Sequence, residues 1–170
     1  MSDSLLSTKL YIPRARPNAI ARSRLTEKLL AGVKQPGSLV LLSGSAGFGK
    51  TTLLSEFAEK SQRPVAWLSL DEGDNDPSRF WTYLIAACQS VHNRVGESAL
   101  ALLHAPQPLP DDAIPTILIN DLVNLEGDLV LILDDYHVIQ NQSIHAALSF
   151  LVDHLPDQLH LVLSTRVDPP

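Results

Sequence analysis

Residues 44–51 read Gly-Ser-Ala-Gly-Phe-Gly-Lys-Thr and decide the fold of this chain. They match the pattern G-x-x-x-x-G-K-[ST], in which the glycines let successive backbone N–H groups turn inward around an anion. A helix after the loop would add the positive end of its dipole. Lys50 can reach the β- and γ-phosphates of a nucleotide, and the hydroxyl of Thr51 can bind magnesium. The pattern predicts a phosphate-binding P-loop.

The segments on either side of the loop fit this interpretation. Residues 39–42, Leu-Val-Leu-Leu, form a continuous apolar run that is typical of a strand buried in a parallel sheet. Residues 50–60 carry their apolar side chains on one side and predict a helix. A strand before the motif and a helix after it are the context that a P-loop requires.

The remaining sequence alternates between strand and helix patterns. Further strands are predicted at 65–70, 129–133 and 159–163, and helices at 23–31, 77–91, 112–125 and around Ile144–Val152. Ser23 is the expected N-cap of the first helix, and Asp76 with Pro77 is expected to begin the 77–91 helix. The alternation predicts an α/β P-loop NTPase fold, with a parallel sheet covered by helices on both faces.

The length of 170 residues suits one domain. Residues 1–37 are interpreted as a lead-in, extended over 1–20, followed by a short helix. Residues 38–170 are interpreted as the nucleotide-binding domain. Because the sequence stops directly after the last predicted strand, we expect a piece of a longer protein, truncated at its C-terminal end.

The net charge of −6 is unevenly distributed. Residues 1–28 hold six basic and two acidic residues, a balance of +4, so the remainder carries −10. An acidic body is a poor nucleic-acid binder by itself, because that affinity comes mainly from neutralising phosphates. The basic head either serves a nucleotide or an acidic partner, or is a solvated leader.

Cys88 is the single cysteine, so an internal disulfide is impossible and a reducing compartment is expected. Its apolar surroundings predict a core position. Trp67 and Trp81 are expected to pack either in the core or against a neighbour. The N-terminus has no signal-peptide pattern, and no apolar run reaches the roughly 18 residues that cross a bilayer. The sequence therefore predicts a cytoplasmic protein without a membrane partner.

An apolar strand that ends in acids follows at 129–135, Leu-Val-Leu-Ile-Leu-Asp-Asp, the Walker B arrangement. Carboxylates at the end of such a strand lie at the crevice where α/β sheets bind ligands. Asp134 would hold magnesium through water, and Asp135 would orient or polarise an attacking water.

Three further features of the sequence each allow two interpretations. Arg166, at the end of the last strand, either senses the γ-phosphate or is an ordinary solvated arginine. For His137, a structural or partner-facing role is at least as plausible as catalysis. The acidic residues of 71–76 favour a solvated loop with a helix cap over a cation site.

The sequence resembles the N-terminal nucleotide-binding domain of large LuxR-family transcription regulators of the maltose-activator type. These regulators belong to the signal-transduction ATPases with numerous domains. The matching segments are Thr8–Leu10, Pro13–Arg14, Ala46–Thr52, Trp67–Glu72, Asp74–Phe80, Leu133–His137, Ile144–His145 and Ser164–Arg166. The Walker segments are generic to P-loop ATPases, whereas 71–75 and 134–137 are more specific.

The resemblance implies a switch whose cofactors are ATP or ADP with Mg²⁺. In such regulators ADP holds a resting monomer, inducer and ATP favour an active oligomer, and slow hydrolysis resets the state. Inducer and DNA would bind through domains outside these residues, while the segment 22–25 would lie near the base and sugar. The expected nucleotide-binding residues are Gly44, Ser45, Ala46, Gly47, Phe48, Gly49, Lys50, Thr51, Thr52, Arg22 and Arg166. Thr51 and Asp134 would hold the metal, and Lys50 and Asp135 would act in catalysis.

The resemblance also implies a sheet in which the first strand lies beside the fourth and a fifth strand covers its other edge. No fifth strand is present in the sequence. We therefore expect the edge of residues 39–43 to cause self-association or to be covered by the N-terminal segment, because bare edges template pairing.

Two alternatives compete with the switch. A stand-alone P-loop enzyme such as a small-molecule kinase needs a lid rich in arginines, yet only Arg79 and Arg94 lie between the second and third strands. A degenerate, non-binding scaffold is disfavoured by the intact Lys50, Thr51 and paired acids.

Overall fold

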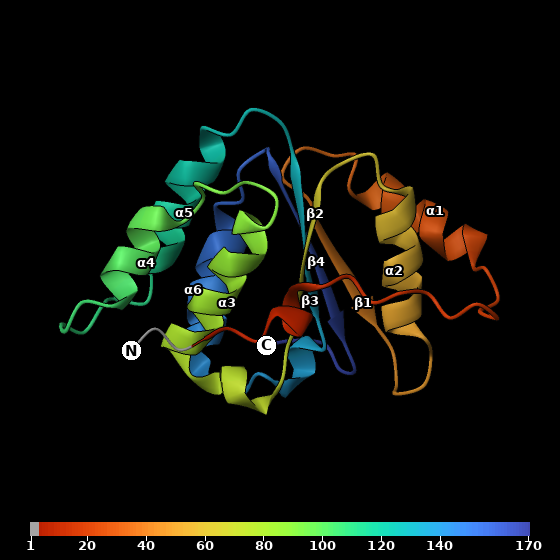
Figure 1. Cartoon of the computed structure of the whole chain (residues 1–170), viewed down its shortest axis with the longest axis horizontal. Helices are drawn as coiled ribbons and strands as arrows, with labels where there is room; N and C mark the ends of the chain where they lie inside the picture. Colours follow the sequence, from red (N-terminus) through yellow and green to blue (C-terminus); the bar gives the residue numbers. More distant parts are fainter. Residues whose placement is uncertain (1–3) are drawn as a thin grey trace.

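The computed structural model describes residues 4–170 and is built around a four-stranded parallel sheet (Figure 1). The strands are β1 (Leu39–Ser43), β2 (Val65–Ser69), β3 (Leu129–Asp134) and β4 (Leu159–Thr165), in the order β1-β4-β3-β2. The first strand pairs with the fourth, as expected from the resemblance. Because all strands are parallel, their carboxyl ends lie at one end of the sheet.

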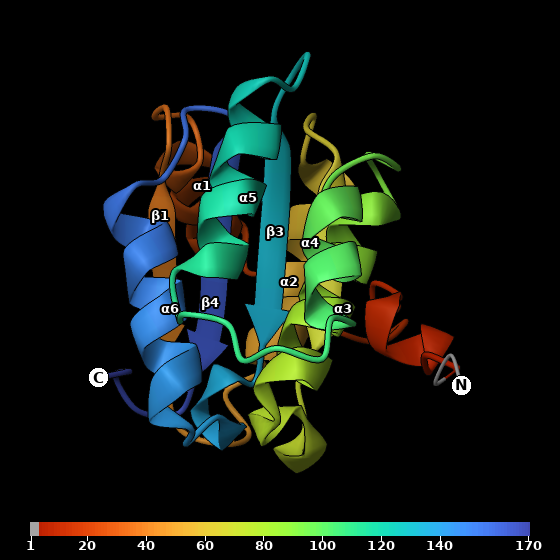
Figure 2. The same ribbon diagram turned by 90° about the vertical axis from the view of Figure 1, so that its left-hand side faces the viewer.

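Helices cover both faces of the sheet, as the sequence predicted (Figures 1 and 2). One face is covered by α1 (Ser23–Gly32) and α2 (Lys50–Lys60). The other side holds α3 (Pro77–Gln89), α4 (Glu97–Leu103), α5 (Ala113–Val123) and α6 (Gln142–Asp153). Short 3-10 helices are η1 (Ser7–Leu10), η2 (Glu72–Asn75) and η3 (Tyr136–Val138).

The central strands are buried on both faces, which explains their continuous apolar runs. Leu129, Leu131 and Leu133 of β3 belong to the core beneath α3–α6. Val130 and Ile132 alternate with them and belong to the core beneath α1 and α2. The period of two along one strand thus builds both halves of the core.

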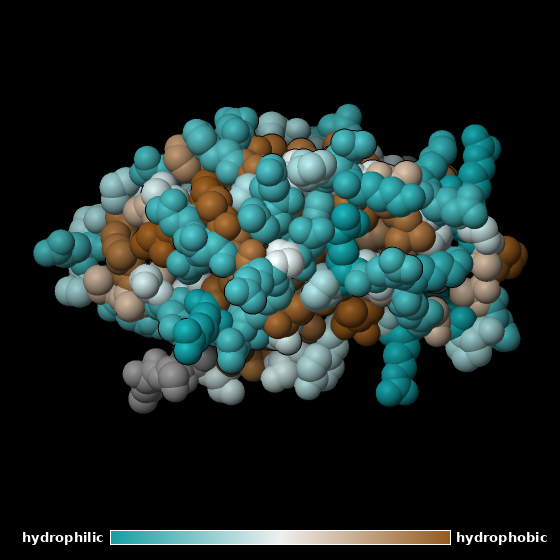
Figure 3. All heavy atoms as spheres, turned by 90° about the horizontal axis from the view of Figure 1, so that it is seen from above, coloured by the Kyte–Doolittle hydropathy of each residue, from teal (hydrophilic) through white to brown (hydrophobic). Residues whose placement is uncertain are grey.

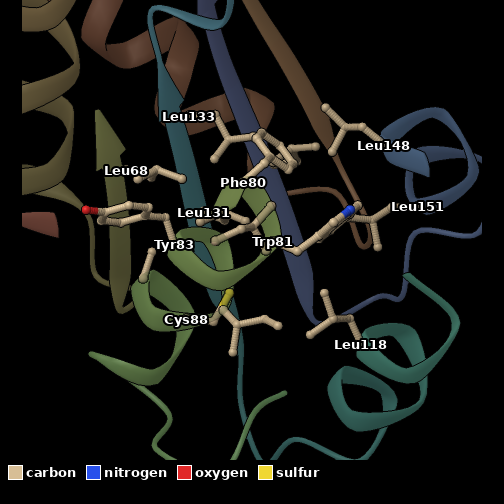
Figure 4. Packing of buried hydrophobic residues seen from close by; sticks show 14 of the residues in the cluster. Leu68, Phe80, Trp81, Tyr83, Cys88, Leu118, Leu131, Leu133, Leu148 and Leu151 are labelled. Atoms are coloured by element: carbon tan, nitrogen blue, oxygen red, sulfur yellow. The ribbon is translucent and has the colours of Figure 1, made fainter. Parts of the chain in front are cut away.

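Figure 4 shows the larger core, where α3 lies against β3 and α6. Phe80 and Trp81 meet edge to face, with 5.3 Å between ring centroids. Cys88 lies in the same cluster, and Trp67 is fully buried in the smaller core. The predicted core positions of both tryptophans and of the cysteine are confirmed.

Several local predictions were wrong at element ends. Ser23 is the first residue of α1, and the N-cap is Arg22, with no side-chain capping hydrogen bond. α3 ends at Gln89 rather than 91. The lead-in is not extended throughout, because Ser7–Leu10 form η1; residues 1–3 lie outside the described residues. α4 was not predicted, since its seven residues are too few to show a helical period.

Of the two outcomes expected for the edge of β1, cover by the N-terminal segment is not seen in the described residues. η1 packs against β2, which forms the opposite edge of the sheet. Among the described residues no strand pairs with the free edge of β1, where Leu39 and Leu41 are 44% and 43% exposed. Self-association through this edge stays a prediction.

Figure 3 views the molecule from above, the end at which the strands begin. On this face apolar residues lie in small groups between polar ones. Within residues 4–170, no helix is long and apolar enough to cross a bilayer.

Candidate functional site

The loop between β1 and α2 lies at the carboxyl end of the sheet. Its shape depends on two glycines, because Gly47 and Gly49 have φ angles of 85° and 72°, where a side chain would be strained. The loop is attached to the sheet by Gly44, whose N–H donates to the carbonyl of Thr165 at 3.1 Å. The predicted loop therefore joins strand to helix with its start fixed against β4.

Lys50 is the first residue of α2, and its ammonium lies across the loop. Nζ donates to the carbonyl oxygen of Gly44 at 2.5 Å and to that of Ser45 at 3.1 Å. The positive charge of Lys50 therefore lies close to the N-terminus of α2. That arrangement favours a polyphosphate at this point.

Asp134 ends β3 and faces the same loop. The Thr51 hydroxyl donates to Asp134 Oδ2 at 2.7 Å, and the Ser164 hydroxyl donates to Oδ1. The carboxyl group is nearly fully buried, and burial raises its pKa. Two hydroxyls from different elements therefore orient one carboxylate.

Thr51 and Asp134 give the oxygen ligands that magnesium prefers. Within the described part of the chain, no three His, Cys, Asp or Glu side chains converge on a metal site. A cation bound to these two residues would need phosphate oxygens and water to complete its coordination, which is the usual arrangement for magnesium. The residues present fit a magnesium–nucleotide complex rather than an all-protein metal cage.

Asp135 has an unusual backbone conformation. Its φ of 62° is in the left-handed region, which non-glycine residues seldom adopt. This turn leads from β3 into η3 and leaves the carboxylate half exposed. His137 Nδ1 lies 3.9 Å from Asp135 Oδ1 and is buried, with no hydrogen-bond partner among residues 4–170.

Arg166 does not lie in the P-loop but in the wall of a neighbouring hollow of about 830 Å³. His137 and Glu72 line the same hollow. Asn75 joins its two sides, because Oδ1 accepts the backbone N–H groups of Gln140 and Asn141 at 2.6 and 3.1 Å. Sequence reasoning missed Asn75, and also Ser164 as the partner of Asp134, because neither role leaves a local pattern.

A second hollow, of about 640 Å³, lies on the other side of the loop. Arg22 Nη1 donates to the carbonyl of Phe48 at 2.5 Å, and its backbone N–H donates to Glu56 Oε2 at 3.3 Å. Gly49, Thr52 and Leu53 belong to the lining, and residues 16–20 form the outer wall. The structure thus brings Arg22 to the P-loop, whereas the wall and Glu56 were not predicted.

The acidic segment 71–76 differs from its prediction. Asp76 caps α3 as expected, accepting the N–H of Arg79 at 2.8 Å. Asp74, however, is fully buried and forms ion pairs with Lys9 and Arg79. The solvated loop was therefore wrong for Asp74, because a partner more than sixty residues away pairs with it.

Comparison with known proteins agrees with this geometry. Residues 20–164 match the family described as AAA ATPase domain. The chain is 39% identical over 166 residues to the HTH-type transcriptional regulator MalT of Yersinia enterocolitica, and 38% identical over 165 residues to that of Yersinia pestis. The alignments cover 98% and 97% of this chain but only 18% of each relative. They confirm the resemblance expected from the sequence.

Among solved structures, Cdc6p from Pyrobaculum aerophilum is similar, with a TM-score of 0.56 and 19% identity. The match covers 93% of this chain and 41% of that one. At this identity the likeness confirms the fold alone.

Proposed function

This chain belongs to the family of AAA ATPase domains, and from that premise we propose that it is the nucleotide switch of a transcription regulator. It would bind ATP or ADP with Mg²⁺ and hydrolyse ATP slowly. The observation that carries the proposal is the meeting of Lys50, Thr51 and Asp134 at one helix N-terminus.

The chain's own groups divide the work of binding. Backbone N–H groups of 44–51, the N-terminus of α2 and Lys50 would hold the phosphates. Thr51 and Asp134 would hold the magnesium ion, which would neutralise charge on the phosphates. The hollow lined by Arg22, Thr52 and residues 16–20 has room for the base and sugar.

The opposite hollow would serve the γ-phosphate end of the site. Asp135, half exposed beside Asp134, would accept a hydrogen bond from the attacking water. Arg166 would sense the γ-phosphate from the wall of that hollow. Only Asp135 would act on the attacking water, and Lys50 is the single basic residue of the loop 44–51. Slow turnover is therefore expected, which suits a switch that must persist in one state.

The kinase alternative is less well supported. A phosphoryl-transfer lid needs free arginines to neutralise charge, but Arg79 pairs with Asp74 at 3.2 Å. Similarity to transcription regulators over nearly the whole chain also favours the switch. DNA and inducer would then be bound by parts of the regulator outside these residues, and a cytoplasmic location stays a prediction.

Calorimetric titration with ATP and with ADP, each with Mg²⁺, tests the binding proposal. Lys50→Ala should weaken binding at least tenfold, because a charge-assisted contact to phosphate is lost. Lys28→Ala removes the same charge from the exposed surface of α1 and should leave affinity unchanged. Absence of saturable binding by the wild type, or equal weakening by both variants, would contradict the proposal.

The switch needs a second experiment. Asp135→Ala should retain ATP binding while lowering hydrolysis, and sedimentation in ATP and in ADP should report different association states. Turnover above about 1 per second, in the range of ordinary enzymes, would argue for a dedicated enzyme. Identical sedimentation in both nucleotides would argue against gating by this chain.

A further inference from the structure

The N-terminal segment is fixed to the body by a buried lysine. Lys9 of η1 is only 5% exposed, and its Nζ donates to Asp71 Oδ2 at 2.8 Å and to the carboxylate of Asp74. The ammonium also lies 4.5 Å from the centroid of the Tyr83 ring. Lysine is almost never buried unless it is paired, so this contact is a specific attachment.

The partners of Lys9 are themselves held in place. Asp74 is fully buried and accepts the N–H of Asp71 at 2.8 Å and Arg79 Nε at 3.2 Å. The Tyr83 hydroxyl accepts the backbone N–H of Leu6 at 2.9 Å. Lys9 also lowers the pKa of Asp71. The attachment joins η1 to η2 and α3 through charge, ring and backbone contacts.

From this attachment the chain crosses to the P-loop side of the molecule. Figure 1 shows the segment leaving η1 and passing the sheet to reach α2 and then α1. Its other end is held by Arg22 at Phe48 and Glu56. Between these ends, residues 12–21 show one hydrogen bond in the described structure, the local one from Ala19 N to Arg16 O at 3.0 Å.

The stretch between the two attachments includes the wall of the 640 Å³ hollow, residues 16–20. Those residues are exposed, and Ile20 is 88% exposed. Because these residues are exposed and show only one local hydrogen bond in the described structure, we expect the wall to depend on its ends for its position. A ligand in the hollow would otherwise have to pay for ordering it.

We propose that Lys9 is a positioning residue for this wall. By fixing one end of the segment, it sets the affinity for the base and sugar of a nucleotide separately from the affinity for its phosphates. This inference rests on the proposed function, since it requires phosphates at the P-loop. Lys9 lines neither hollow, and in this proposal it acts on the wall through residues 10–22.

Titration of the whole chain with Mg·ATP and with Mg·tripolyphosphate, which lacks base and sugar, tests the inference. Lys9→Met should weaken ATP on the order of tenfold, while tripolyphosphate stays within about twofold. Lys28→Met, which removes a charge from the same basic head, should change neither. Equal weakening of both ligands, or unchanged ATP affinity, would overturn the inference. A wild type that binds neither ligand would overturn the proposed function first, so the two failures differ.

Two further variants keep the test decisive. Lys9→Arg keeps the charge and should restore the wild-type ratio of the two affinities. If Lys9→Met does not fold by circular dichroism, Asp71→Asn removes one partner whose side chain is half exposed. It should shift the same ratio by a smaller factor, and an unchanged ratio in that folded variant would overturn the inference.

Discussion

Replacing Asp134 by asparagine is expected to stabilise the fold and abolish magnesium-dependent nucleotide binding. The residue is 3% exposed, and burial raises the pKa of its carboxyl group. Among the described residues no cation forms an ion pair with it; its partners are the hydroxyls of Thr51 and Ser164. The ionised form is therefore held at a cost that serves ligand binding rather than folding.

The size of the gain follows from those contacts. Asparagine has the same shape, and because hydroxyls both donate and accept, it can keep one hydrogen bond through Oδ1 and another through Nδ2. The substitution removes the free-energy cost of desolvating the Asp134 charge, which its two hydrogen bonds offset only in part. A gain of about 1 kcal/mol is expected. For a domain of this size it corresponds to a rise in Tm of about 2–4 °C.

The pH dependence gives the prediction its sign. An acid whose pKa is raised in the folded state binds its proton more tightly there, so ionisation destabilises the fold. The penalty is complete above the raised pKa and disappears as the pH falls below the ordinary value of 3.8. The advantage of the asparagine variant should be largest at neutral pH and shrink toward zero in acid.

Thermal unfolding without nucleotide, followed over a pH series, measures this difference. Asp135→Asn is the matched control, because it removes a neighbouring charge that is half exposed and asparagine tolerates the left-handed conformation. Its Tm should stay within about 1 °C. An Asp134→Asn protein that is less stable at neutral pH, or whose advantage persists in acid, would refute the reasoning.

Three further predictions follow from single side chains. Gly49→Ala places a Cβ at a φ of 72°, 3.4 Å from the Arg22 guanidinium; it should cost about 1–2 kcal/mol by denaturant unfolding and weaken ATP by calorimetry. Cys88, whose pKa burial raises to about 12, should react with a thiol reagent only at the rate of unfolding; fast labelling of the native protein would contradict its burial. Asp76→Ala removes the cap on the N–H of Arg79 and should lower stability by about 1 kcal/mol, with nucleotide affinity unchanged.

The sequence could predict those parts of the site whose residues lie close together along the chain. The segment 44–51 contains its own glycines, lysine and hydroxyl, and Asp134 follows an apolar run whose strand character is local. Their meeting could also be expected, because parallel strands bring their carboxyl ends together. The sequence could not predict the register between β3 and β4. It is this pairing that brings Ser164 beside Asp134.

The N-terminal segment was mispredicted for a related reason. Its positive charge allowed three interpretations, a site for a nucleotide, a site for an acidic partner or a solvated leader, and all of them assume that each basic residue faces outward. Lys9 instead pairs with Asp71 and Asp74, 62 and 65 positions along the chain. Charge composition cannot separate a lysine at the surface from one that is paired in the interior, because pairing depends on the tertiary fold.

Nucleotide recognition by this chain would then depend on two kinds of contact, a local loop for the phosphates and a long-range ion pair for the wall beside them. The second can be altered without touching the first, which is why the ratio of the two affinities, rather than either alone, reports on Lys9.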